Sequence, residues 1–237
     1  RYSLLKEISD WLELGSHPNI VRALRVEQQG NPPVPYLVLE WINGQNENTG
    51  SSIADLLHNR RRRPFTFRKT LSLAFDIATG MAYATERIPG LVHRDLKPGN
   101  ILVDENGMAL VSDFGLLKIY ASDSGEPPSP PAQPQQKGGD SNQSLHVQAA
   151  GTPPYMAPEQ WSHKTTLDAR ADIYALGCIL YEMVTGARAA PSSKDKQEMR
   201  AIHLEGRLQP IPDGVPAPLA ELITQCLAND IDQRPGD

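Results

Sequence analysis

Apolar residues in the first fifty positions follow first a helical and then a strand-like pattern. Over residues 1–14 the spacing predicts a helix that ends at Gly15, with Leu4, Leu5, Ile8, Trp11, Leu12 and Leu14 as its apolar positions. Two apolar runs at 20–27 and 36–41 are separated by a Gly-Asn-Pro-Pro sequence, which predicts two antiparallel strands joined by a turn. The polar stretch at 43–52 predicts a loop.

After residue 50 the pattern becomes mainly helical. The spacing predicts helices over 53–59, 68–87, 168–185, 194–204 and 217–228. On the longest of them the expected buried face comprises Leu71, Ala74, Phe75, Ala78, Met81 and Ala82. Short apolar runs predict small strands at 91–92, 101–103 and 109–111. A few strands followed by many helices indicate an α+β fold.

Residues 121–144 differ in composition from the rest of the chain. These 24 positions hold five Pro, five Ser, four Gln and three Gly, with only two Ala as apolar content. Such a segment buries too little apolar surface to offset the entropy lost on ordering. We therefore expect a disordered insert here.

Composition places the chain among globular proteins. It has 237 residues, of which 39% are hydrophobic and 22% charged, so a sizeable core is expected. The net charge of −5 argues against a broad surface for nucleic acid or anionic membrane. No apolar run is long enough to span a bilayer. The two cysteines, Cys178 and Cys226, lie in apolar stretches, which favours a reducing, cytoplasmic location over a disulfide scaffold.

The ends of the sequence suggest a piece of a longer protein. The chain starts at Arg1 inside a helical pattern, and it stops at Asp237 directly after Gln-Arg-Pro-Gly. The parent protein could then be tethered to a membrane by a segment outside this chain.

The strongest chemical signal is a set of motifs in a fixed order. The first, over residues 91–103, reads LVHRDLKPGNILV. It is followed by Ser-Asp-Phe-Gly at 112–115 and by GTPPYMAPE at 151–159. The triplet His93-Arg94-Asp95 alone could be an ordinary charged turn. In this combination and order, the chain resembles the protein kinase family.

The resemblance implies a two-lobe kinase fold over nearly the whole chain. Residues 1–40 would be the remnant of the small lobe, with its regulatory helix and two strands. Residues 41–237 would be the mainly α-helical large lobe, with the insert at 121–144 in its activation segment. The implied activity is transfer of the γ-phosphoryl group of ATP, with Mg²⁺, to a protein hydroxyl.

The family's catalytic roles carry over to matching positions. By resemblance, Asp95 is the catalytic base, Lys97 approaches the γ-phosphate, and Asn100 and Asp113 hold Mg²⁺ through hard oxygen ligands. Lys97 in the catalytic loop is typical of serine/threonine kinases rather than tyrosine kinases. Thr152 agrees, because this threonine bridges the catalytic Asp and Lys in that class. The motif wording is most similar to bacterial members, and the implied partners are proteins with Ser or Thr.

The resemblance also implies binding and supporting residues. The adenine side would involve Leu39 as gatekeeper, the backbones of Glu40 and Ile42, Leu102 below the ring, and Glu7 on the regulatory helix. The implied supporting residues are His93 as a packing residue, Phe114 and Gly115 of the Asp-Phe-Gly motif, Asp172 as anchor of the catalytic loop, and Glu159 with Arg234 as a buried ion pair.

Regulation and docking leave alternatives open. Arg94 could pair with a phosphate on Ser141 or Ser144 and so order the long activation segment, or the insert could be inert. If the activation segment is phosphorylated in this way, two copies of the protein could associate to autophosphorylate it. The basic run at 60–63 is either a solvated loop or a docking patch for acidic peptides or lipid headgroups.

One departure from the family leaves the activity itself open. Only six residues precede Glu7, so neither a glycine-rich loop nor the strand lysine that binds ATP is present upstream. The chain as given is therefore expected to be a poor kinase or inactive. The alternative to an enzyme is a non-catalytic kinase-like scaffold or regulatory module, but the intact Asp95, Lys97, Asn100 and Asp113 favour the enzyme.

Overall fold

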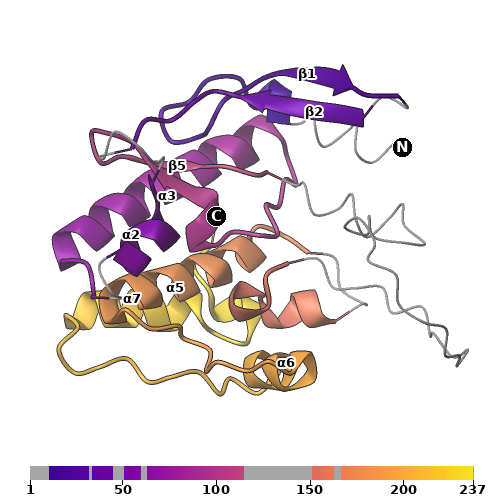
Figure 1. Ribbon diagram of the computed structural model, residues 1–237. Coiled ribbons are helices and arrows are strands. Elements are labelled where there is room, and N and C mark those ends of the chain that lie inside the picture. Colours follow the sequence, from indigo (N-terminus) through magenta and orange to yellow (C-terminus); the bar gives the residue numbers. More distant parts are fainter. Residues whose placement is uncertain are drawn as a thin grey trace, which may run out of the picture.

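The computed structural model describes residues 11–31, 34–44, 51–59, 63–114, 151–162 and 167–236. A two-stranded hairpin lies at one end of the molecule, and the helices are stacked below it (Figure 1). The mixture of small antiparallel sheets and helices confirms the predicted α+β class.

The hairpin consists of β1 (Ala23–Gln29) and β2 (Val34–Leu39), paired antiparallel from Ala23 opposite Leu39 to Gln29 opposite Val34. This confirms the predicted pair, although β1 begins three residues later than expected. Ile20 and Val21 pair instead with Val111, whose carbonyl accepts from the Val21 N–H at 2.9 Å. The start of the run thus connects the hairpin to the second sheet.

The second sheet has the order β3-β4-β5, with antiparallel neighbours. Its strands are β3 (Ser51–Ser52), β4 (Ile101–Val103) and β5 (Ala109–Val111). The last two were predicted from their apolar runs, whereas β3 lies where a loop was expected. Ser51 and Ser52 are polar but buried, because they pair with Val103 and Leu102 of β4.

The predicted strand at 91–92 is wrong. Leu91 and Val92 lie in irregular backbone that leads into the segment from His93 onward. The N–H of His93 donates to the carboxylate of Asp172 at 2.7 Å rather than to a neighbouring strand. A side chain from a distant helix therefore takes the hydrogen bond that a sheet would have used.

Helix α3 (Phe67–Arg87) follows α2 (Ile53–Asn59), and Thr66 caps it by accepting from the Lys69 N–H at 3.3 Å. Its buried face comprises Thr70, Leu73, Ile77, Gly80 and Ala84.

The predicted apolar face of α3 was wrong in part, since only Ala74 and Met81 of its residues pack against the main core. Leu71 is 50% exposed and Phe75 is 72% exposed, and Ala78, Met81 and Ala82 line a hollow between α3 and α5. Gly80 helps to select the other face, because a Cβ at this position would lie 2.6 Å from the carbonyl oxygen of Asn19.

Helix α5 (Arg170–Thr185) is the centre of the helical part and is buried on nearly all sides. It packs against α3 and against α7 (Ala217–Cys226), with α6 (Lys196–Leu204) at the far end of the molecule (Figure 1). All three predicted helices in this region are confirmed within a few residues. Gly186 ends α5 in the left-handed region, at φ +74°.

Both cysteines are free and buried, as their apolar surroundings predicted. Burial raises the pKa of the Cys226 thiol to about 11, and it also raises that of Cys178. No helix among the described residues is long and apolar enough to cross a membrane.

The contact between α5 and α7 yields a stability prediction. A Cβ at Gly177 would lie 2.7 Å from the Cβ of Cys226, so Gly177→Ala forces the two helices apart. The gain in helix propensity is about 1 kcal/mol, and overpacking costs about 1–3 kcal/mol. We expect a net loss of unfolding free energy in urea denaturation. Gly214→Ala, where a Cβ meets open space, is the control and should leave stability nearly unchanged; equal effects would contradict the prediction.

Candidate active site

The segment between α3 and β4 brings Asp95 and Lys97 to Thr152, which lies more than fifty residues further along the chain. Lys97 Nζ donates to Asp95 Oδ2 at 2.5 Å and to Thr152 Oγ1 at 2.9 Å. The Thr152 hydroxyl in turn donates to Asp95 Oδ1 at 2.6 Å. The Asp95 side chain is 8% exposed and that of Lys97 is 29% exposed. Both oxygens of a nearly buried carboxylate are thus oriented by partners.

Asn100 belongs to the same network. Its Nδ2 donates to the Asp95 carbonyl at 2.9 Å and to Asp95 Oδ2 at 3.2 Å. The amide oxygen takes part in neither bond. Asn100 stands at the end of a 3₁₀ turn, Pro98–Asn100, directly before β4, so the sheet fixes its backbone.

Asp113 follows β5 and is joined to Asn100 through Ser112. The Ser112 N–H donates to the Asn100 carbonyl at 2.9 Å, and its hydroxyl contacts the same carbonyl at 3.1 Å. The Ser112 hydroxyl also lies 3.5 Å from Asp113 Oδ2. Asp113 has φ +61°, a left-handed conformation that is rare outside glycine. Adjacent strands β4 and β5 therefore present Asn100 and Asp113 at the same end of the sheet.

His93 and Phe114 pack beneath this network. The His93 ring is completely buried, its Nε2 lies 2.8 Å from the Ser112 carbonyl, and its centroid is 4.9 Å from that of Phe114. Phe114 also lies against Trp11, with ring centroids 6.1 Å apart. The two side chains thus link the segment around Asp113 to the N-terminal part of the described chain.

Asp172 of α5 binds the backbone N–H groups of the two residues that precede Asp95. Its Oδ2 accepts from the His93 N–H at 2.7 Å, and its Oδ1 accepts from the Arg94 N–H at 2.9 Å. Burial raises the pKa of the Asp172 carboxyl, whereas its electrostatic interaction with His93 and the N–H donors of His93 and Arg94 oppose that shift. Arg94 itself enters through its backbone, which has φ +70°.

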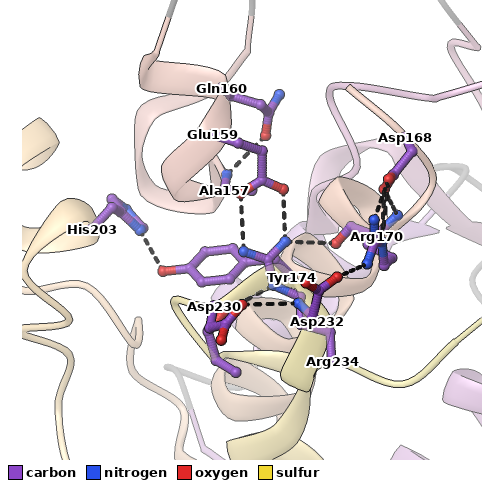
Figure 2. Close-up of polar contacts among 11 residues, drawn as sticks. Ala157, Glu159, Gln160, Asp168, Arg170, Tyr174, His203, Asp230, Asp232 and Arg234 are labelled. Carbon is purple, nitrogen blue, oxygen red and sulfur yellow. Dashed lines mark hydrogen bonds and ion pairs between the residues drawn. The ribbon is translucent and has the colours of Figure 1, made fainter. Parts of the chain in front are cut away.

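Glu159 and Arg234 form a bidentate ion pair (Figure 2). The guanidinium nitrogens lie 2.7 and 2.9 Å from the two carboxylate oxygens, and the side chains are 12% and 0% exposed, respectively. Arg234 also donates to the carbonyl of Arg170 at 2.8 Å and lies 5.0 Å from the ring centroid of Tyr174. The pair therefore connects the segment after Thr152 to α5.

The residues expected on the adenine side lie around the end of β2 and on β4. Leu39, Ile42 and Leu102 are partly buried against the main core. The Glu40 N–H already donates to the Arg22 carbonyl at 2.9 Å, so an adenine contact at Glu40 would use its carbonyl oxygen.

Several expected residues lie outside the part of the chain that the structure describes. These are Glu7, Gly115, Ser141 and Ser144, together with the insert at 121–144 and positions 60–62 of the basic run. Their assignments stay predictions.

The order of the motifs and the hydrogen-bond network around Asp95 are consistent with the match of the sequence to a protein family model. The family model for the protein kinase domain matches residues 2–236. The chain belongs to the protein kinase family.

Curated relatives of the chain are serine/threonine kinases. It is 28% identical to serine/threonine-protein kinase PknB of Mycobacterium tuberculosis over 92% of the chain and 31% of the relative. It is 32% identical to serine/threonine-protein kinase CTR1 of Arabidopsis thaliana, over 92% of the chain and 23% of the relative. It is also 32% identical to a probable serine/threonine-protein kinase of Streptomyces coelicolor, over 72% and 22%. The chain therefore spans less than a third of the length of these kinases.

Sequence reasoning missed two groups of buried polar residues around this kinase site. The Tyr155 hydroxyl donates to Glu182 of α5 at 2.5 Å, and burial, more than the nearby Glu182, raises the pKa of this tyrosine. Gln160 bonds both to Ala157 and to the carbonyl of Arg94. The only sequence signal for them was their place in or beside the GTPPYMAPE motif, because the bonds of Tyr155 to Glu182 and of Gln160 to Arg94 connect residues far apart in the sequence.

The Glu159–Arg234 pair yields a second stability prediction. Glu159→Gln leaves the guanidinium of Arg234 buried without its countercharge, which should lower the unfolding free energy by about 3–5 kcal/mol. Glu198→Gln is the matched control, since Glu198 pairs with Arg207 at 3.0 Å with both side chains nearly half exposed. That change should cost less than about 1 kcal/mol. Similar urea midpoints for the two variants would contradict a structural role for the buried pair.

Proposed function

We propose that this chain is the catalytic part of an ATP- and Mg²⁺-dependent serine/threonine protein kinase. The observation that carries the proposal is the three-way contact of Asp95, Lys97 and Thr152. A carboxylate, an ammonium group and a hydroxyl at hydrogen-bond distance are the groups that phosphoryl transfer to an alcohol requires: a proton acceptor, a neutralising charge and an orienting contact.

Asp95 is the proposed proton acceptor. As the hydroxyl oxygen of a protein Ser or Thr bonds to the γ-phosphorus, the bond from that phosphorus to the β-γ bridging oxygen breaks and the hydroxyl proton passes to the Asp95 carboxylate. Each carboxylate oxygen has two acceptor positions, so Asp95 can accept this proton while Lys97 and Thr152 still hold it. Lys97 forms an ion pair with Asp95, and its side chain remains partly exposed. This exposure would allow its ammonium group to contact a phosphate oxygen as well.

The donor set at the ends of β4 and β5 fits Mg²⁺. A carboxylate from Asp113 and an amide oxygen from Asn100 are hard ligands, and Mg²⁺ is typically held by one or two protein groups together with phosphate oxygens. When bound, the ion neutralises the charge on the phosphates. The Nδ2 bonds of Asn100 to Asp95 orient its amide so that the oxygen is the atom left for a ligand.

The organisation of the chain is part of the proposal. Residues 1–40 would belong to the small lobe and residues 41–237 to the large lobe, with adenine between Leu39 and Leu102. The lining of that pocket would also include the backbone of Ile42. Arg94 would bind a phosphate on the activation segment, for which Ser141 and Ser144 are the proposed acceptors.

The proton acceptor gives the first test of the proposal. Asp95→Asn keeps the size of the side chain but removes the base, so kcat for phosphate transfer to a Ser peptide should fall at least about 10²-fold. Nucleotide affinity, measured by calorimetry, should change little. The control is Asp213→Asn, an exposed carboxylate on a loop, which should retain activity.

The assays use the full-length protein with Mg²⁺-ATP. A variant Asp95→Asn with full activity would overturn the assignment of the base. A wild-type protein that binds the nucleotide but transfers no phosphate would favour the alternative of a non-catalytic scaffold or regulatory module.

Thr152 provides a second test. Thr152→Ser retains a hydroxyl that can bridge Lys97 and Asp95, whereas Thr152→Val keeps the shape and loses both hydrogen bonds. We expect Thr152→Ser to stay within a few-fold of wild type and Thr152→Val to lose about tenfold or more in kcat, because the carboxylate loses its orientation. Equal rates for the two variants on Ser and Thr peptides would argue against the bridge.

A further inference from the structure

Gln160 joins two segments that are far apart in the sequence. It lies on the 3₁₀ turn Pro158–Trp161 and is only 9% exposed. Its Oε1 accepts from the Ala157 N–H at 2.8 Å, a local bond seen in Figure 2. Its Nε2 donates to the carbonyl of Arg94 at 2.9 Å, across 66 positions of sequence. Both ends of one buried amide are therefore used.

The second bond acts on a residue in an unfavourable conformation. Arg94 has φ +70°, which is costly for a residue with a Cβ unless the surroundings hold it there. Asp172 holds its N–H at 2.9 Å, and Gln160 holds its carbonyl. The Arg94 carbonyl and the Asp95 N–H belong to one planar peptide unit, so a donor on that carbonyl fixes the plane from which the Asp95 side chain projects.

The same carbonyl is enclosed by a glycine. A Cβ at Gly151 would lie 3.3 Å from the Arg94 carbonyl oxygen and 2.8 Å from Met156, and Gly151 has φ +143°. The next residue, Thr152, bonds the Asp95 carboxylate. The segment from 151 to 160 thus contacts the Asp95 side chain through Thr152 and the carbonyl of the preceding residue, Arg94, through Gln160.

The two bonds of Gln160 make different chemical demands. Capping of Ala157 needs only an acceptor oxygen, which a glutamate would supply as well. The bond to the Arg94 carbonyl needs a hydrogen donor, which a glutamine supplies and an ionised glutamate does not. Turn capping alone therefore explains the acceptor oxygen of Gln160 but does not explain its donor nitrogen.

We propose that Gln160 is a positioning residue that holds the Arg94–Asp95 peptide unit in the orientation needed for phosphoryl transfer, and so makes the geometry of Asp95 depend on the ordered state of the segment from 151 to 160. The inference rests on the proposed kinase function and names a residue that acts through Asp95 without contacting the substrate.

The decisive variant is Gln160→Glu. Its carboxylate can still accept from Ala157 but faces the Arg94 carbonyl oxygen with negative charge, so at about pH 8 kcat should fall by about tenfold or more while KM for ATP stays unchanged. Burial raises the pKa of a carboxyl group, so lowering the pH protonates this glutamate and restores a donor to the carbonyl. The ratio of its kcat to that of wild type should therefore rise from about pH 8 to about pH 6.

The wild-type profile and two further variants isolate this effect. Dividing by the wild-type profile removes the pH dependence that the reaction shows without the substitution. The ionisable residues in the surrounding network are Arg94, Asp95, Asp172 and His93 on the catalytic side and Glu159 with Arg234 on the helical side. Gln160→Met keeps the volume and loses both bonds at every pH, so its kcat should be low without a rise at acidic pH. Gln209→Glu adds the same charge on an exposed loop position and should follow wild type.

The outcomes separate this inference from the proposed function. Wild-type protein without phosphate transfer would reject the kinase function itself. Active wild type with a Gln160→Glu variant of equal kcat at all pH values would overturn the positioning role. A Gln160→Glu variant with a lowered melting temperature but unchanged kcat would do the same, because it would limit Gln160 to capping the turn. If Gln160→Met fails to fold, the pH dependence of Gln160→Glu still decides.

Discussion

Asp172, in the first turn of α5, has a buried carboxylate that accepts hydrogen bonds from the backbone N–H groups of His93 and Arg94. A carboxylate removed from water is costly unless such donors surround it, so the helix and the loop stabilise each other. The loop cannot move without leaving the carboxylate unpaired. This contact holds Arg94 in its left-handed conformation and thereby fixes the backbone position of Asp95. The hydrogen bonds of Lys97 and Thr152 to the Asp95 carboxylate depend on that position.

The same helix anchors the segment from 151 to 162 through separate contacts. Glu182 accepts from Tyr155, the carbonyl of Arg170 accepts from Arg234, and Arg234 in turn holds Glu159. Tyr174 lies under the guanidinium and bonds His203 of α6 at 2.8 Å (Figure 2). Because α5 is buried on nearly all sides, it provides a rigid base on which two remote segments are brought to each other.

The residues around Asp95 differ in how deeply they are buried, and this difference separates the ones that hold the backbone from the ones that face solvent. The groups that hold backbone in place, such as Asp172 and Gln160, are buried and satisfied by fixed partners. Lys97 keeps nearly a third of its side chain exposed, so its ammonium group faces solvent while it also contacts Asp95. Burial of His203 lowers its pKa to about 4, so the imidazole is neutral near pH 7 where it contacts the Tyr174 hydroxyl.

The sequence by itself determined the family and the positions of most elements. The order of the motifs predicts which residues form the candidate site, because the spacing within each motif is local. These residues are Asp95, Lys97, Asn100, Asp113 and Thr152. Periodicity also located α3 and α5, but it misplaced the centre of the buried face of α3. Leu71 and Phe75 are exposed, while Leu73 and Ile77 are buried. An apolar stripe shows that a helix packs, whereas the face that packs depends on what approaches it, here the carbonyl of Asn19 at Gly80.

The tertiary structure alone decided three further features. These are the short strand Ser51–Ser52, the irregular backbone at 91–92 and the hydrogen bond from Gln160 to Arg94. Each depends on a hydrogen-bond partner dozens of residues away, and no local pattern of polar and apolar positions records such a partner.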